Sequence, residues 1–154
     1  MRISLICVGK LGRSPEAALA AAYAERASAA GRSLALGPVE IREVEGRKPG
    51  KPAEADAILE RLAGGPLIAC DEHGEGLASR EIAKLLERFR DDGARELAFA
   101  VGGANGLDDR VRNAARSSLA FGPQTWPHAL ARVMLAEQIY RAISILGGGP
   151  YHRD

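Results

Sequence analysis

The last four residues of the chain carry side chains that could do chemistry. They supply a phenol, an imidazole, a guanidinium and a carboxylate, from Tyr151, His152, Arg153 and Asp154. The imidazole titrates near neutral pH, the guanidinium can grip a phosphate, and the phenol can stack on a nucleobase. A glycine-rich segment, 147–150, precedes them. Two interpretations stay open: a polar tail that lies in water, as chain ends often do, or half of an active site.

Three further stretches are candidates because each follows a predicted strand. They are "CDEHGEG" from Cys70, "VGGANGL" from Val101 and "FGPQTWPH" from Phe121. In open α/β sheets, ligands bind beyond the carboxyl ends of the strands. We therefore expect these stretches to meet at one edge of a sheet.

The stretch "VGGANGL" lets the backbone approach a ligand closely, because Gly102, Gly103 and Gly106 have no Cβ. It does not match GxGxxG. No acidic residue lies between Arg110 and Ala136, where a dinucleotide site would place the acid that holds a ribose. The pattern therefore argues against NAD, and a plain tight turn remains the alternative.

The stretch "FGPQTWPH" contains residues that could form a pocket in which backbone groups bind adenine. Pro123 and Pro127 stiffen the connection, and Trp126 offers a flat apolar wall. The alternative is a rigid turn with a tryptophan in the core. His128, near the predicted start of a helix, could cap or pack.

The composition excludes several classes of protein. The chain has 154 residues, 46% hydrophobic and 27% charged, which is typical of one soluble domain over residues 1–154. No apolar run approaches the roughly 20 residues of a membrane span, and no signal-peptide cleavage site follows the N-terminus. Cys7 and Cys70 are not spaced like metal ligands, so no metal is expected. We expect both thiols to be reduced, which favours a cytoplasmic protein.

The net charge of +1 hides an asymmetry. From Arg110 to the end there are six arginines and two acids, so this segment carries +4 and the remainder −3. A basic segment in a near-neutral protein favours an anionic partner, and a solvated helix face is the alternative.

Strand and helix patterns alternate along the chain, which predicts an α/β fold with a mostly parallel sheet flanked by helices. Short apolar runs predict strands at 2–8, 36–44, 66–70, 96–101 and 117–122. Helices are predicted at 15–30, 53–63, 79–90 and 127–146, with a further one capped by Asp108. Ser14 is the predicted N-cap of the first helix.

The last predicted helix has apolar side chains in nearly every direction. Such a helix is buried on more than one side. We expect one of these sides to face a second subunit in a homodimer. The alternative is packing between the sheet and the first helix of the same chain.

Four motifs, in order along essentially the whole chain, resemble the ribosomal RNA large-subunit methyltransferase H family of SPOUT methyltransferases. They are "LICVGK", "VGGANGL", "WPHALARVMLAEQIYRA" and "PYHRD". The resemblance implies an α/β SPOUT fold with a deep C-terminal trefoil knot, which is a rare feature among folds. It also implies a homodimer that transfers a methyl group from S-adenosyl-L-methionine to N3 of a pseudouridine in 23S rRNA of the assembled ribosome.

The resemblance also assigns the site residues. The cofactor site would contain Cys70, Gly102, Gly103, Phe121, Gly122, Pro123, Gln124, Thr125 and Trp126. Tyr151, His152 and Arg153 would form the catalytic and substrate side, reaching the cofactor of the other subunit. Arg141 and His128 are weaker candidates.

The chain departs from the usual family pattern at Asp154, at Cys70, where leucine is frequent, and at "GPQ" in place of a serine-containing triplet. The contacts of these residues are therefore less certain to transfer.

Methyl transfer to a ring nitrogen requires alignment and loss of the nitrogen proton. His152 is the candidate base, with Tyr151 and Asp154 as rivals, and Arg153 would hold phosphate or stabilise negative charge. The segment "RKPGK", with Arg47, Lys48 and Lys51, could contact phosphates. Two alternatives remain: a methyltransferase of the same fold that acts on tRNA, and a non-catalytic ribosome-binding module.

Overall fold

Five parallel strands form one sheet in the order β2-β1-β4-β3-β5. The computed structural model describes all of residues 1–154. Its strands are β1 (Arg2–Val8), β2 (Val39–Val44), β3 (Leu67–Glu75), β4 (Glu96–Val101) and β5 (Ser117–Leu119). The predicted α/β class with a parallel sheet is confirmed, while the C-terminal knot stays a prediction.

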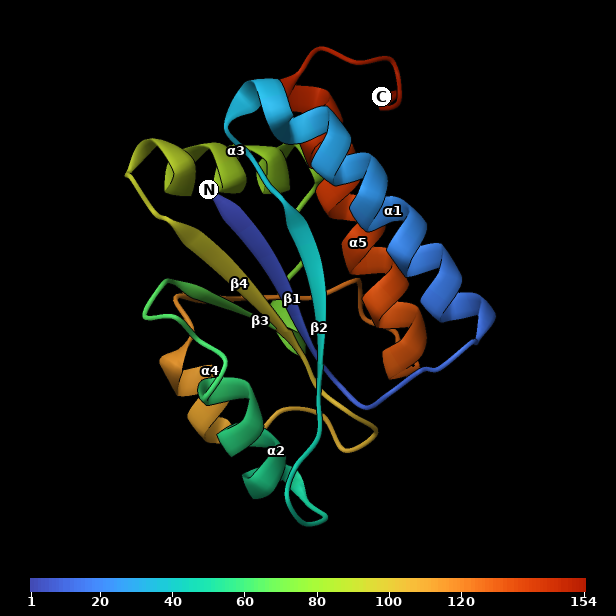
Figure 1. Ribbon diagram of the computed structural model, residues 1–154, viewed down its shortest axis with the longest axis vertical. Coiled ribbons are helices and arrows are strands. Elements are labelled where there is room, and N and C mark those ends of the chain that lie inside the picture. Colours follow the sequence, from blue (N-terminus) through green and yellow to red (C-terminus); the bar gives the residue numbers. More distant parts are fainter.

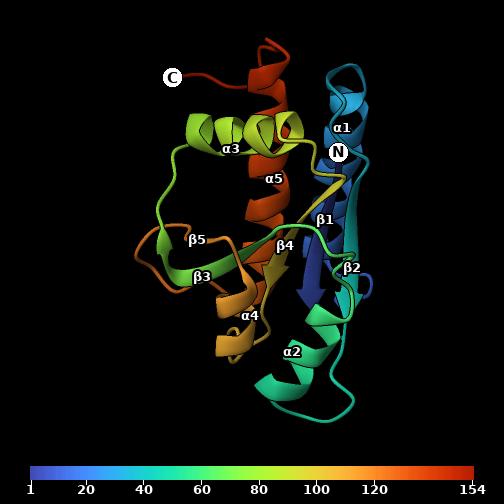
Figure 2. The ribbon, with the colours of Figure 1, turned by 90° about the vertical axis from the view of Figure 1, so that its left-hand side faces the viewer.

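Helices cover both faces of the sheet (Figures 1 and 2). On one face, α1 and α5 lie side by side and α3 packs against α5, whereas the two short helices α2 and α4 contact each other and the other face. The helices are α1 (Pro15–Gly31), α2 (Lys51–Leu59), α3 (Ser79–Asp91), α4 (Asp109–Ala114) and α5 (His128–Leu146), with a 3₁₀ turn at Arg32–Leu34.

The strands are buried on both faces because they alternate between two cores. Ile3, Leu5 and Cys7 of β1 face the larger core under α1, α3 and α5. Ile6 and Val8 of the same strand face the smaller core under α2 and α4. This explains why β1 reads as a continuous apolar run, as expected of a central parallel strand.

Two predicted helix caps are confirmed. The hydroxyl oxygen of Ser14 accepts a hydrogen bond from the backbone N–H of Ala17 at 3.1 Å. The carboxylate of Asp108 accepts one from the N–H of Arg110 at 2.9 Å. Each cap satisfies a donor that the first turn of a helix leaves unpaired.

The packing of α5 follows the alternative interpretation. Val133, Leu135, Ile139 and Ile143 are buried among α1, α3 and the sheet of the same chain. Their apolar character therefore needs no second subunit. Leu130, on the same helix, stays 40% exposed. The homodimer stays a prediction.

A buried arginine fixes the beginning of α5 next to the carboxyl ends of β1 and β2. The side chain of Arg132 is 2% exposed and donates to the carbonyl oxygen of Gly9 at 2.9 Å. It also lies 3.5 Å from the carboxylate of Glu43, the last but one residue of β2. This anchor sets the position of the first turn of α5, which contributes to the site described below.

Several predicted boundaries were wrong. The third strand does not end at Cys70 but continues to Glu75, through a register shift in which both residues pair with Leu119. Residues 71–75 are polar because they lie beyond the buried part of the strand, so an apolar pattern could not find them. The fifth strand ends at Leu119, and the second helix begins at Lys51.

Candidate functional site

The three predicted stretches meet in one cleft at the carboxyl ends of β3, β4 and β5. The cleft has a volume of about 880 Å³. Pro123 is the one predicted cofactor residue that does not line the cleft. The eight that do are Cys70, Gly102, Gly103, Phe121, Gly122, Gln124, Thr125 and Trp126. His128 also lines it. Chain segments 50 residues apart in sequence thus form one concave surface, as expected for open α/β sheets.

The glycine loop after β4 is packed so tightly that side chains are excluded. A Cβ on Gly102 would lie 2.7 Å from the backbone carbon of Gly106. A Cβ on Gly103 would lie 3.1 Å from Cγ1 of Val8 and 3.5 Å from Oε1 of Glu54. The loop is closed by the N–H of Gly106, which donates to the carbonyl oxygen of Gly103 at 3.0 Å. A ligand on this loop would therefore meet backbone directly.

A half-buried carboxylate lies behind the glycine loop. Oε2 of Glu54, on α2, is shielded from solvent and has no hydrogen-bond partner in the protein. Glu54 takes part in none of the salt bridges, although Lys51, one turn earlier, lines the cleft. A shielded carboxylate oxygen without a partner is costly, and native structures contain few of them.

Trp126 forms a wall of the cleft, and the alternative of a core tryptophan is wrong. Its side chain is 42% exposed, and its indole N–H donates to the carbonyl oxygen of Phe121 at 3.1 Å. Gly122 lies between them with φ of +97°, a backbone conformation that favours glycine. The indole N–H, the only polar group of the Trp126 ring, is therefore bonded to the backbone of the same loop, and this bond holds the ring in place.

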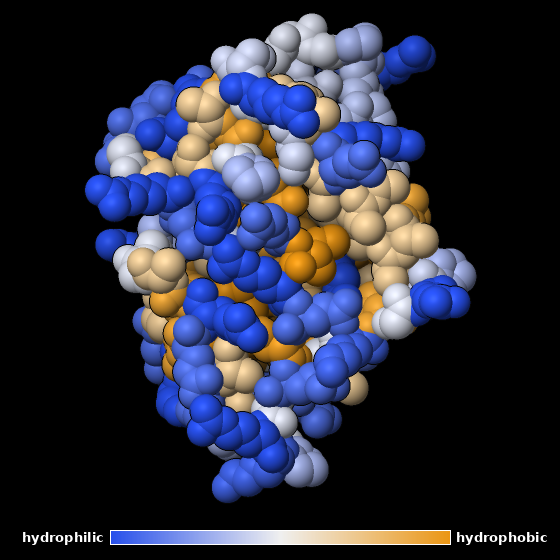
Figure 3. Space-filling view, in the orientation of Figure 1, coloured by the Kyte–Doolittle hydropathy of each residue, from blue (hydrophilic) through white to orange (hydrophobic).

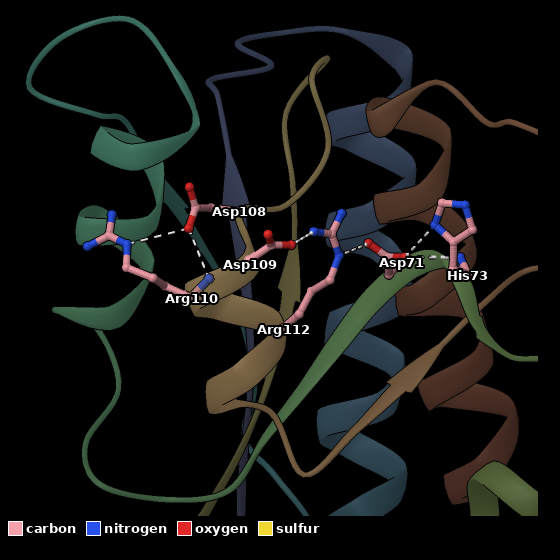
Figure 4. Close-up of polar contacts among 6 residues, drawn as sticks. All are labelled: Asp71, His73, Asp108, Asp109, Arg110 and Arg112. Atoms are coloured by element: carbon pink, nitrogen blue, oxygen red, sulfur yellow. Dashed lines mark hydrogen bonds and ion pairs between the residues drawn. The ribbon is translucent and has the colours of Figure 1, made fainter.

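An ion-pair network supports the β3 wall of the cleft (Figure 4). The carboxylate of Asp71, whose side chain is 7% exposed, accepts a hydrogen bond from Nε of Arg112 on α4 at 2.7 Å. It also accepts from the N–H of His73 at 3.0 Å, and Arg112 reaches Asp109 at 2.7 Å. Burial opposes ionisation of Asp71, but the hydrogen bonds from Arg112 and His73 outweigh it and lower its pKa. Asp71 is thus a structural anion at the cleft edge.

Cys70 contributes a neutral thiol. Burial raises its pKa above the ordinary value, with further contributions from Cys7 and Asp71. A protonated thiol is a weak nucleophile, because the thiolate is the reactive form. Cys70 therefore packs in the cleft and does not compete for an electrophilic group bound there.

The C-terminal tail does not line the cleft of its own chain. The cleft contacts the beginning of α5 at His128, while the tail leaves from the end of this helix at Leu146. A helix of 19 residues is about 28 Å long at 1.5 Å per residue. Figure 2 shows the C-terminus above α3, reached from the far end of α5.

The tail folds back onto α5 through an aromatic and ionic cluster. The hydroxyl of Tyr151 donates to Oε1 of Glu137 at 3.0 Å, and its ring centroid lies 4.5 Å from that of Tyr140. The guanidinium of Arg141 stacks 4.7 Å from the ring of Tyr151 and forms a salt bridge with Glu137. The weaker candidate Arg141 thus belongs to the tail and not to the cofactor cleft.

The last residues join this cluster to α3. Nε2 of His152 lies 3.0 Å from the carboxylate of Asp154, which in turn accepts a hydrogen bond from Nε of Arg80 at 2.9 Å. The hydrogen bonds from Arg80 and His152 lower the pKa of Asp154 to about 2. Burial and the hydrogen-bonded neighbours raise the pKa of Tyr151 above its ordinary value. Asp154 is therefore a weak base, and Tyr151 stays protonated at neutral pH, while the role of His152 as the base stays a prediction.

A second groove runs from the cleft to the tail cluster. It shares Phe121 and Gly122 with the cleft and reaches Glu137, the residue that holds Tyr151. Its apolar wall includes Met134 of α5 and Leu19 of α1, which is 47% exposed. Figure 3 shows the alanine-rich surface of α1 on the right, next to a part of this face where hydrophilic and apolar residues are interspersed.

Sequence reasoning did not assign several residues to the cofactor site. Asp71, within the candidate stretch "CDEHGEG", Lys51, expected only as a phosphate contact, and Arg112 line the cleft, and Glu54 lies directly behind it. Asp71 had a signal, because it directly follows the apolar run of β3. Arg112 and Glu54 had none, since their places depend on how α4 and α2 pack against the sheet.

No helix of the protein has both the length and the apolarity that crossing a membrane requires. The structure also contains no group of three or more His, Cys, Asp and Glu residues that could hold a metal ion.

A parallel sheet of this order, with a glycine loop and a tryptophan loop around one cleft, agrees with the class of α/β methyltransferases that the motifs indicate. The chain belongs to the predicted SPOUT methyltransferase family, whose model matches residues 1–152.

Relatives of the same length share much of the sequence. A protein of Caulobacter sp. (strain K31) is 62% identical over 154 residues, covering 100% of both chains, and is named ribosomal RNA large subunit methyltransferase H. A Caulobacter vibrioides protein of that name is 60% identical over 100% of this chain and 99% of its own. The crystal structure of a probable methyltransferase from Bordetella pertussis Tohama I matches the fold with a TM-score of 0.56 at 20% identity, covering 92% of this chain and 96% of that one.

Proposed function

We propose that the protein transfers a methyl group from S-adenosyl-L-methionine to N3 of a pseudouridine in the 23S rRNA of the assembled ribosome. The observation that carries the proposal is the identity of 62% over the full length to a relative named for this ribosomal RNA methylation class. The cleft adds support, because eight of the nine cofactor residues implied by the motifs line it. A ribosomal substrate would place the reaction in the cytoplasm.

The cleft has groups that suit this methyl donor. The tight loop at Gly102 and Gly103 leaves backbone as the contact surface for a ribose, and Phe121 and Trp126 supply apolar walls for a flat purine. The unpaired oxygen of Glu54 suits a ligand with a positive charge. When bound, the cofactor supplies an electrophilic methyl group on sulfur.

We further propose that the active site is shared between two subunits of a homodimer. The tail of each chain lies outside its own cleft, at the far end of α5, although it carries the residues that the motifs assign to catalysis. A symmetric dimer can place the tail of one subunit over the cleft of the other. The groove between cleft and tail, with exposed Leu19, offers an apolar surface for such a contact. The trefoil knot implied by the motifs belongs to this proposal.

In this mechanism the chain aligns the reactants and moves one proton. His152 would take the proton from N3 of the pseudouridine, so that the nitrogen lone pair could accept the methyl group that the bound cofactor would supply, with the electron pair of the donor bond left on sulfur. Arg153 holds the RNA phosphate or the negative charge on the base. The neutral thiol of Cys70 leaves the nitrogen as the favoured acceptor of the methyl group.

Transfer of a radiolabelled methyl group tests the proposal. Assembled ribosomes, free large subunits and tRNA are incubated in parallel with the protein and the labelled cofactor. We expect label in the 23S rRNA of ribosomes, at a pseudouridine. Label in tRNA alone would assign a different substrate, and absence of both cofactor binding and transfer would leave a ribosome-binding module.

A further inference from the structure

Behind the glycine loop, the carboxylate of Glu54 has one shielded oxygen without a hydrogen-bond partner. Glu54 lies beside Gly103, and this oxygen, Oε2, has neither solvent nor a hydrogen-bond donor. Asp71, a carboxylate that lines the cleft, is paired with Arg112 at 2.7 Å. Glu54 therefore remains a negative charge without a partner beside the cleft wall.

Such a charge acts across the wall because glycine leaves the wall thin. Oε1 and Oε2 of Glu54 lie 3.5 and 3.7 Å from the point that a Cβ of Gly103 would occupy. Solvent does not reach Oε2, so salt and water screen its field less than that of a surface group. Glu54 therefore adds a negative contribution to the field on the cleft side of Gly103.

We propose that Glu54 is the residue by which the cleft prefers the positively charged methyl donor to the neutral product. This inference rests on the proposed cofactor. S-adenosyl-L-methionine carries a positive charge on its sulfur, and S-adenosyl-L-homocysteine, which remains after methyl transfer, carries none there. The rest of the two molecules is the same. Contacts to adenine, ribose and the amino-acid end bind both equally, so a preference requires a group that senses the charge.

The preference has a use in turnover. Each methyl transfer removes the positive charge and with it the attraction to Glu54, so the product is held less tightly than the donor. A cleft that bound both equally would be blocked by its product at equal concentrations. Glu54 is thus a specificity residue that acts through the field of its carboxylate, without touching the reacting atoms.

Calorimetric titration of the full chain with each ligand in turn tests this role. For the wild type we expect a lower dissociation constant for the sulfonium form than for the thioether form. In Glu54→Gln, which keeps the shape and removes the charge, we expect the ratio of the two constants to fall by roughly tenfold, through weaker binding of the charged ligand. Glu60→Gln is the matched control, because Glu60 directly follows α2 and is 61% exposed.

A second measurement needs no variant, which matters if Glu54→Gln folds poorly. An aza analogue with a protonated amine in place of the sulfonium should bind the wild type about as tightly as the methyl donor does. Equal loss of affinity for both natural ligands in Glu54→Gln, or tighter binding of the thioether than of the aza analogue, would overturn the inference. If the wild type binds none of these ligands, the proposed function itself fails.

Discussion

The hydroxyl of Tyr151 donates a hydrogen bond to Oε1 of Glu137, 3.0 Å away, and so holds the C-terminal tail on its own α5. The same glutamate lines the groove that extends to Phe121 and Gly122 at the cleft. The tail is therefore docked on a surface that leads toward the cleft, but the tail does not enter the cleft of its own chain. The proposed active site, shared between two subunits, would give this arrangement a function.

Replacing His152 by alanine should separate catalysis from cofactor binding. His152 lies in the tail cluster, 3.4 Å from Arg141, and does not line the cleft. We expect methyl transfer to ribosomes to fall at least about a hundredfold, the usual contribution of a general base. The dissociation constant of the cofactor, measured by calorimetry, should stay within twofold to threefold. Turnover close to that of the wild type would remove His152 from this role.

Gly102→Ala should damage the cleft. The new Cβ would lie 2.7 Å from the backbone of Gly106, so the loop must shift and its contact surface changes. We expect cofactor affinity to fall at least about tenfold, since backbone contacts depend on close approach. Gly76→Ala is the control, because nothing lies within 4 Å of its added carbon. Equal cofactor affinity of the two variants would contradict the assigned site.

The Asp71–Arg112 pair should stabilise the fold in a pH-dependent way. The pKa of Asp71 is lowered in the folded state, so its contribution is complete above the unfolded pKa of about 3.9 and is lost as the pH falls through the folded value. We expect Asp71→Asn to cost about 1–3 kcal/mol at pH 7.

Urea unfolding of both proteins at several pH values measures this difference. The gap between wild type and Asp71→Asn should narrow at the most acidic pH at which both still fold. A gap that stays constant, or one that widens in acid, would show that the carboxylate charge has no such role.

Parts of the site were predictable from local patterns, and parts depend on packing. The glycines at 102–103 and the loop around Trp126 follow strand-like runs, so strand ends predicted them. The Asp71–Arg112 pair joins residues 41 positions apart, and no local pattern connects them. Glu54 looks like an ordinary first-turn acid of a helix until α2 is packed behind Gly103.

The fold shows the same division. Alternation of apolar runs and helices predicted five strands, but the continuation of β3 to Glu75 rests on pairing with Leu119 across a register shift. Apolar periodicity carries no information about such polar edge pairing. The burial of α5 was likewise ambiguous, because a helix packed by α1 and α3 and one packed by a second subunit have the same pattern.

Binding to ribosomes should depend steeply on salt. Lys48 and Arg47 are exposed on the loop before α2, and Lys51 lines the cleft, so these groups can replace counterions on RNA phosphates. We expect the logarithm of the association constant to fall linearly with the logarithm of salt concentration. Lys48→Gln should reduce this slope by about one. A flat response in filter binding would argue against an RNA partner.

Complementation between two impaired variants, assayed at a cofactor concentration too low to saturate Gly102→Ala, tests the shared active site most directly. One variant carries Gly102→Ala and keeps its tail; the other ends at Gly149 and keeps its cleft. After unfolding and refolding together, half of the dimers contain one of each, and each of these has one intact cleft beside one intact tail. In the proposed dimer the tail acts on the partner's cleft, so we expect the mixture to regain about a quarter of wild-type methyl transfer. A mixture that forms mixed dimers yet stays as inactive as its components would contradict the account.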